Sequence, residues 1–185
     1  MLGRRAFVAG SVAASALPAF AGKPMPPKVG AIRWPGSEHD LHGFMAIPAK
    51  AHGRQPAVLI VPDGNGADKF ALSFTDWLAL AGFVACIPRA LPSLDDALAT
   101  VRWLATNRYA TGKVAAIGLG RGGELVDRIA VSPQALLAAG VTFGVPAAVA
   151  GPVPLRRFGA LNALAADAYD HVWQEILAFL KEQLA

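Results

Sequence analysis

The string Gly-Leu-Gly-Arg-Gly-Gly at residues 118–123 has the spacing most indicative of chemistry in this sequence. It lies between a predicted strand and a predicted helix, and it fits two patterns. Read as G-x-G-x-x-G, it is typical of a turn that binds a dinucleotide pyrophosphate. Read as G-x-S-x-G, it is typical of a strained strand-to-helix turn that presents a nucleophile. In the second pattern Gly120 occupies the position of the nucleophile.

The dinucleotide interpretation lacks the acidic residue that such a site also requires. It requires an acidic residue about twenty positions further on to bind the ribose. After Asp127 the next acidic residue is Asp167. The turn also follows the third strand of an alternating series, whereas a dinucleotide site normally uses the first strand. This interpretation remains an alternative.

The elements that would position this turn alternate between apolar strands and amphipathic helices. Strands are predicted at 29–34, 41–47, 57–61, 83–87, 113–118, 139–145 and 153–158, and helices at 70–81, 93–107, 121–131 and 167–184. Ser93 is a predicted helix N-cap, and Gly82 a predicted helix end. The first two strands form a predicted antiparallel pair. The later alternation predicts an α/β fold with a mostly parallel sheet covered by helices on both faces.

Composition narrows the class of protein. The 185 residues suit one domain, and 54% hydrophobic with 16% charged residues excludes disorder and a coiled coil. The single cysteine, Cys86, excludes an intramolecular disulfide and is predicted to be a buried apolar residue. The net charge is +4 without a stripe of Lys or Arg, so we expect no nucleic-acid partner.

The N-terminus predicts bacterial export. Arg4 and Arg5 precede an uncharged stretch, and Ala19-Phe20-Ala21 fits a cleavage site. We therefore expect a twin-arginine-type signal peptide over residues 1–21, a Pro-rich linker over 22–28, and one domain over 29–185 in the periplasm or secreted. An uncleaved membrane anchor is the alternative. The uncharged stretch Ile129–Leu155 contains four prolines, which favours buried strands over a membrane span.

Five stretches resemble the dienelactone hydrolase family, in family order. They are Pro56–Gly66, Trp77–Pro88, Leu94–Ala105, Lys113–Gly123 and Trp173–Leu184. The resemblance implies a small α/β-hydrolase-like fold, shortened in its last third, and hydrolysis of small carboxylic esters or lactones without a cofactor.

The family's Cys-His-Asp triad maps poorly onto this chain. Gly120 stands at the nucleophile position and has no side chain to attack a substrate. Asn162 stands near the position of the acid, and an amide does not stabilise an imidazolium as a carboxylate does. His171 is the one histidine after residue 52, and it lies inside the final predicted helix, which favours a solvent-facing residue over a catalytic one.

The frame of the family's site is retained. Asp63, Gly64 and Asn65 follow the first core strand, where the family has an acidic residue and a loop that supplies an oxyanion-hole amide. The resemblance implies that the second amide belongs to Arg121, beside Gly122. Asp63 also fits an ordinary turn residue, and Arg121 a solvated side chain.

These observations leave three hypotheses. The chain is an ester or lactone hydrolase, or a non-catalytic periplasmic relative that binds a small carboxylate or a protein partner, or a dinucleotide-binding module. No cofactor is predicted. No metal is predicted either, because the sequence shows no acidic or cysteine cluster that would join His39, His42 and His52 in a metal site. A homodimer could cover a sheet face left bare by the shortened last third, and no stable membrane insertion is expected after signal removal.

Overall fold

A computed structural model describes residues 25–51, 53–146, 151–161 and 168–185. The predicted signal peptide, residues 22–24 of the linker, His52 and Asn162 therefore lie outside the described residues.

Seven strands form one mixed sheet in the order β1-β2-β4-β3-β5-β6-β7. The strands are β1 (Lys28–Pro35), β2 (Asp40–Ile47), β3 (Gln55–Val61), β4 (Val84–Pro88), β5 (Ala110–Leu119), β6 (Leu137–Phe143) and β7 (Leu155–Phe158). β1 pairs with β2, and β2 with β4, in the antiparallel sense, while β4, β3, β5, β6 and β7 are mutually parallel. This confirms the predicted α/β class and its mostly parallel sheet.

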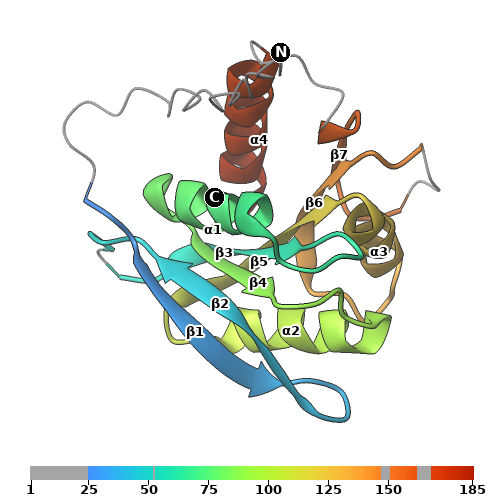
Figure 1. Cartoon of the computed structure of the whole chain (residues 1–185), viewed down its shortest axis with the longest axis horizontal. Helices are drawn as coiled ribbons and strands as arrows, with labels where there is room; N and C mark the ends of the chain where they lie inside the picture. Colours follow the sequence, from blue (N-terminus) through green and yellow to red (C-terminus); the bar gives the residue numbers. More distant parts are fainter. Residues whose placement is uncertain (1–24, 52, 147–150, 162–167) are drawn as a thin grey trace, which may run out of the picture.

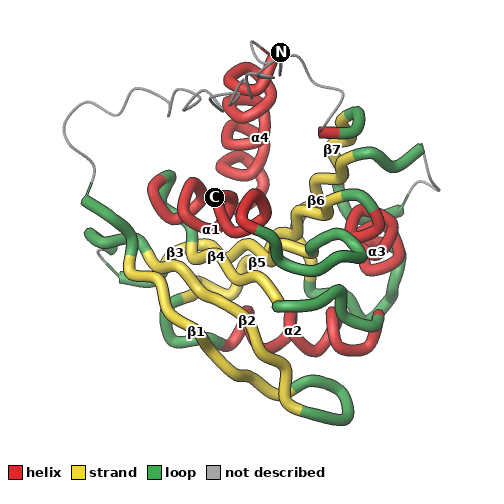
Figure 2. Tube along the Cα trace, in the orientation of Figure 1, coloured by secondary structure: helices red, strands yellow, loops and turns green. Residues whose placement is uncertain are grey.

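Four helices cover the sheet in the described residues, two on each face. They are α1 (Lys69–Leu80), α2 (Leu94–Thr106), α3 (Arg121–Ala130) and α4 (Ala168–Leu184). α1 and α4 pack on one face, and α2 and α3 on the other (Figures 1 and 2). The central strands are buried on both faces, as a parallel sheet between helix layers requires.

Local signals in the sequence account for several helix ends. The Ser93 hydroxyl accepts a hydrogen bond from the Asp96 N–H at 3.1 Å, which confirms the predicted N-cap. Gly82 has a φ of +101° immediately after the C-cap of α1, so it ends that helix as expected. The strand predicted over 153–158 is shorter and begins at Leu155, after Pro154, which has no N–H to donate to a neighbouring strand.

The β1–β2 hairpin is fastened to α2 by a hairpin clasp formed by Ser37, Ser93 and Asp96. The Ser37 N–H and hydroxyl donate to Asp96 Oδ1 at 2.8 and 2.7 Å, and the Ser93 hydroxyl donates to Oδ2 at 2.9 Å. Burial would raise the pKa of Asp96, but these hydrogen bonds and the nearby His39 lower it below the ordinary value of 3.8. The clasp therefore holds a buried carboxylate in its charged form.

An aromatic cluster fixes the start of α4 against α1. The Trp173 ring lies 5.9 Å from Phe74 and 5.7 Å from Trp77, both in edge-on geometry. The cluster anchors α4 above the carboxyl ends of β5 and β6. The first turn of α4 is thereby placed beside the turns that the sequence singled out.

Candidate functional site

The turn between β5 and α3 is a tight elbow built by glycines. Gly120 has φ +53° and ψ −120°, a conformation that residues with a Cβ rarely adopt. A Cβ on Gly118 would lie 2.4 Å from the Gly122 carbonyl oxygen, and one on Gly122 would lie 2.2 Å from the Val61 carbonyl oxygen. The two flanking glycines thus let α3 begin against the end of β3.

The Asp63 carboxylate occupies the space beside Gly120. A Cβ on Gly120 would lie 2.8–2.9 Å from the Asp63 Cγ and both carboxylate oxygens. A serine or cysteine at this position would therefore collide with Asp63 as it stands. The elbow has no nucleophilic side chain, and the carboxylate of Asp63, in the loop after β3, lies where such a side chain would project.

Asp63 also accepts hydrogen bonds from backbone amides at the elbow. Its Oδ1 accepts hydrogen bonds from the Gly64 N–H at 2.7 Å and from the Arg121 N–H at 3.0 Å. The Arg121 N–H belongs to the first residue of α3, where a helix terminus attracts negative charge. Asp63, Gly120 and Arg121 are called the elbow cluster below. The resemblance assigned the Arg121 amide, and an amide of the loop at residues 63–65, to an oxyanion hole. In the structure the Asp63 carboxylate accepts from the Arg121 amide and from the Gly64 amide of that loop.

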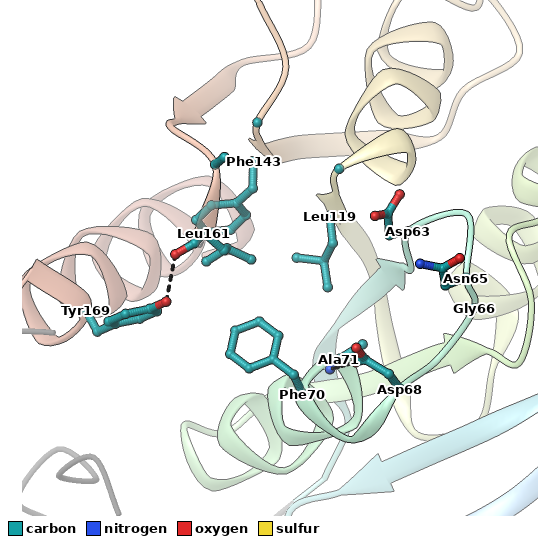
Figure 3. A pocket seen from close by; sticks show the side chains of 13 residues that line it. Asp63, Asn65, Gly66, Asp68, Phe70, Ala71, Leu119, Phe143, Leu161 and Tyr169 are labelled. Carbon is teal, nitrogen blue, oxygen red and sulfur yellow. Dashed lines mark hydrogen bonds between the residues drawn. The ribbon is translucent and has the colours of Figure 1, made fainter. Parts of the chain in front are cut away.

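A pocket of about 560 Å³ opens beside the elbow cluster (Figure 3). It lies at the carboxyl ends of the parallel strands, the usual place for a ligand in such sheets. Its lining residues are Asp63, Asn65, Gly66, Asp68, Phe70, Ala71, Leu119, Gly120, Phe143, Gly144, Ala160, Leu161 and Tyr169. Polar groups therefore stand along one side, and Figure 3 shows Tyr169 and Leu161 across the pocket from them.

Several of the predicted site residues line this pocket. Asp63, Asn65 and Gly120 do, whereas Gly64, Arg121 and Gly122 are neighbours in the chain that are not among the lining residues. The Arg121 side chain extends over Gly64, since a Cβ on Gly64 would lie 3.0 Å from one guanidinium nitrogen. The sequence thus predicted one side of the pocket.

The predicted histidines do not reach the pocket. His171 is exposed on α4 and is not among the lining residues. His39 and His42 are exposed on the hairpin, beyond the opposite edge of the sheet. Within the described ranges no three His, Cys, Asp or Glu side chains gather in a geometry suited to a metal ion.

Cys86 is fully buried in β4, as the sequence indicated. Burial raises the pKa of its thiol well above the ordinary range. The side chain is therefore a core residue rather than a reactive group.

Sequence reasoning missed two lining residues: Tyr169, across the pocket from Asp63, and Asp68, on the same side as Asp63. Tyr169 on α4 donates its hydroxyl to the Leu161 carbonyl oxygen at 2.7 Å, which fastens the helix to the segment after β7. Asp68 is the N-cap of α1, and its Oδ1 accepts from the Ala71 N–H at 2.8 Å. An acidic residue just before a predicted helix is a usable signal for the cap, but its place in the pocket lining depends on tertiary structure.

A second polar cluster lies behind the elbow and was also missed. Arg157 on β7 forms an ion pair with Asp127 on α3 at 2.6 Å and approaches the Thr142 hydroxyl at 3.4 Å. Both charged side chains are largely buried. The pair ties the short edge strand β7 to α3 and does not line the pocket.

A mostly parallel sheet, helices on both faces and a glycine elbow after a central strand define the α/β-hydrolase fold. Solved structures agree. A dienelactone hydrolase-like promiscuous phosphotriesterase from metagenomic libraries is 17% identical with a TM-score of 0.72, and the match covers 87% of this chain and 100% of that chain. Dienelactone hydrolase from Anabaena variabilis is 14% identical with a TM-score of 0.68 over the same shares.

Sequence comparison indicates the family. Residues 41–93 match the model of the dienelactone hydrolase family. A curated Escherichia coli (strain K12) protein, described as the hydrolase fragment YghX, is 30% identical over 60 residues, which is 32% of this chain. That match spans about half, 51%, of the relative's length. The family model and the curated relative thus indicate similarity to dienelactone hydrolases over part of the chain, and the solved structures show the α/β-hydrolase fold.

Proposed function

We propose that this chain is a non-catalytic member of the dienelactone hydrolase family that binds a small organic molecule in the pocket beside Asp63. The observation that carries the proposal is the elbow cluster. Gly120 supplies no nucleophile, and the Asp63 carboxylate fills the adjacent space and holds the Arg121 N–H. A substrate carbonyl would find neither an attacking group nor a vacant donor pair.

The same geometry argues against two of the ligands considered from the sequence. A small carboxylate would compete with Asp63 for the Gly64 and Arg121 amides. A dinucleotide pyrophosphate would need the start of α3, where Asp63 already stands. A neutral or cationic ligand meets neither obstacle.

Ester or lactone hydrolysis is the second candidate, and the family comparisons favour it. In that case Asp63 would have to activate a water molecule, because it is the one carboxylate beside the elbow. The two candidates differ in the fate of a bound ester.

Ligand-observed NMR with benzyl acetate separates them. We expect saturable binding without release of benzyl alcohol above the buffer rate. Ala160→Trp, on the exposed rim of the pocket, should abolish binding, and Ala178→Trp, exposed on α4 away from the pocket, should not. Protein-dependent release of benzyl alcohol would establish the hydrolase, and unchanged binding by Ala160→Trp would refute the pocket as the site.

Export and self-association are further proposals. Arg4, Arg5 and the Ala19-Phe20-Ala21 site support twin-arginine-type export to the periplasm. In the described residues no helix is both long and apolar enough to cross a bilayer. Fractionation of a bacterium that expresses the full chain, with Arg4 and Arg5 replaced by Lys as the control, tests export. Gel filtration tests the homodimer.

A further inference from the structure

We infer that the ligand of this pocket is an organic ammonium ion with an aromatic or alkyl body. This inference rests on the proposed function, since it names the ligand class of the same pocket. It follows from the charges that line the pocket, the hydrogen bonds those charges already make, and the groups across from them.

Two carboxylates line the pocket, each with an oxygen left free for a ligand. Asp63 uses Oδ1 for the Gly64 and Arg121 amides, and Asp68 uses Oδ1 for the Ala71 amide. Within the described part of the chain neither Oδ2 accepts a hydrogen bond, and neither carboxylate forms an ion pair. The Oδ1 contacts hold both groups in place, so the free oxygens are positioned before a ligand arrives.

The charges of the described lining are negative. Among the lining residues that the structure describes there is no Lys, Arg or His, and Asp63 and Asp68 carry the formal charges. The helix N-termini of α1 and α3 point at the pocket, but each already carries a protein carboxylate. An anionic ligand would meet the negative charge of these carboxylates, whereas an ammonium group can donate a hydrogen bond to a free Oδ2 atom.

The remaining wall suits the body of such a ligand. Phe70 is 39% exposed although it is a large apolar side chain, and it lines the pocket next to Ala71. Tyr169 is held by its hydroxyl, so its ring keeps one orientation at the opposite wall. Aromatic rings attract cations as well as apolar groups, and Leu119 and Leu161 add apolar surface between them.

Three probes test the preferred charge of the ligand: benzylammonium, benzyl alcohol and benzoate. They share an aromatic body and differ in the charge of the head group. Calorimetric or NMR titration at pH 7 should rank benzylammonium first, roughly fivefold above benzyl alcohol, because an exposed charge pair contributes up to about 1 kcal/mol. Benzoate should bind most weakly. The preference for benzylammonium should shrink as salt is raised.

Asp63→Asn and Asp68→Asn test the two carboxylates. Each keeps an Oδ1 acceptor for the helix amide and removes one charge. Each substitution should weaken the affinity for benzylammonium roughly threefold and leave the affinity for benzyl alcohol unchanged. Glu182→Gln, exposed at the far end of α4, is the matched control and should change neither. Arg121→Ala removes a nearby positive charge and should strengthen benzylammonium.

Equal or tighter binding of benzoate or benzyl alcohol would overturn the ammonium inference while leaving the proposed binding function intact. Unchanged benzylammonium affinity in both aspartate variants would do the same. Failure of all three probes and of benzyl acetate to bind would overturn the proposed function as well, so the two failures are distinguishable.

Discussion

The hairpin clasp and the elbow cluster are both built around an aspartate carboxylate, but the two carboxylates have different roles. In each, an aspartate accepts hydrogen bonds from a backbone amide more than fifty residues away in the chain. Asp96 is buried, and both of its oxygens accept hydrogen bonds. Asp63 is exposed and lines the pocket, and its Oδ2 accepts no hydrogen bond among the described residues. A carboxylate whose two oxygens both accept hydrogen bonds fastens two elements of the fold. A carboxylate with one oxygen free can still accept a hydrogen bond from a ligand.

Removing the clasp carboxylate should have the largest effect on folding. Asp96→Ala leaves the Ser37 and Ser93 donors without their acceptor and should lower the free energy of unfolding by about 3 kcal/mol. Urea denaturation measures this change. Asp95→Ala, on the adjacent exposed position of α2, should cost no more than about 1 kcal/mol through the helix dipole. Equal losses in the two variants would refute the clasp.

Adding a methyl group at the elbow should be the next most costly change. Gly120→Ala imposes an unfavourable φ and a contact with Asp63, so it should destabilise the protein by about 2–3 kcal/mol. In an Asp63→Gly background the contact is gone and the cost should fall to about 1 kcal/mol. A double-mutant cycle in urea measures the coupling. Additive costs would show that Asp63 does not occupy the space beside Gly120.

The clasp should also weaken in acid. The folded-state pKa of Asp96 is lowered, so its stabilising contribution is complete above the unfolded-state value, near 3.8, and is lost as pH falls through the lower folded-state pKa. The difference in unfolding free energy between wild type and Asp96→Asn should therefore be constant from pH 7 to pH 5 and shrink below pH 4. A difference that grows on acidification would contradict the sign of this shift.

Neutralising the elbow carboxylate should change folding least. Asp63→Asn keeps an oxygen acceptor for the Gly64 and Arg121 amides and loses the attraction of a charge to the start of α3. That loss corresponds to less than about 1 kcal/mol. The same urea denaturation measures this change. A loss as large as that of Asp96→Ala would show that Asp63, like Asp96, serves mainly to hold the fold together.

Much of this fold follows from the sequence, because local patterns dictate its elements. Runs of apolar residues predicted the strands, and apolar residues at three- and four-residue spacing predicted the helices. Single residues, Ser93 and Gly82, predicted where one helix begins and another ends. The alternation of these elements predicted the parallel sheet. Element boundaries moved by a few residues where pairing partners extend a strand, as when β5 begins at Ala110 opposite Gln55.

The site was predicted in part for the same reason. Gly118, Gly120 and Asp63 lie in turns whose composition signals their conformation. The contact between Asp63 and the Arg121 amide joins residues 58 positions apart, and no local pattern encodes it. The placement of Tyr169 likewise depends on how Trp173 packs against α1. Tertiary packing therefore decides what the elbow does, beyond the glycines that form it.

Hydrolysis of p-nitrophenyl acetate by the purified chain tests the central claim most directly. We expect release of p-nitrophenol at the buffer rate for wild type and for Asp63→Asn alike, because the elbow has no nucleophile and its amides already hold Asp63. A wild-type rate well above the buffer that collapses in Asp63→Asn would contradict this account. It would show that Asp63 activates water and that the chain is an esterase.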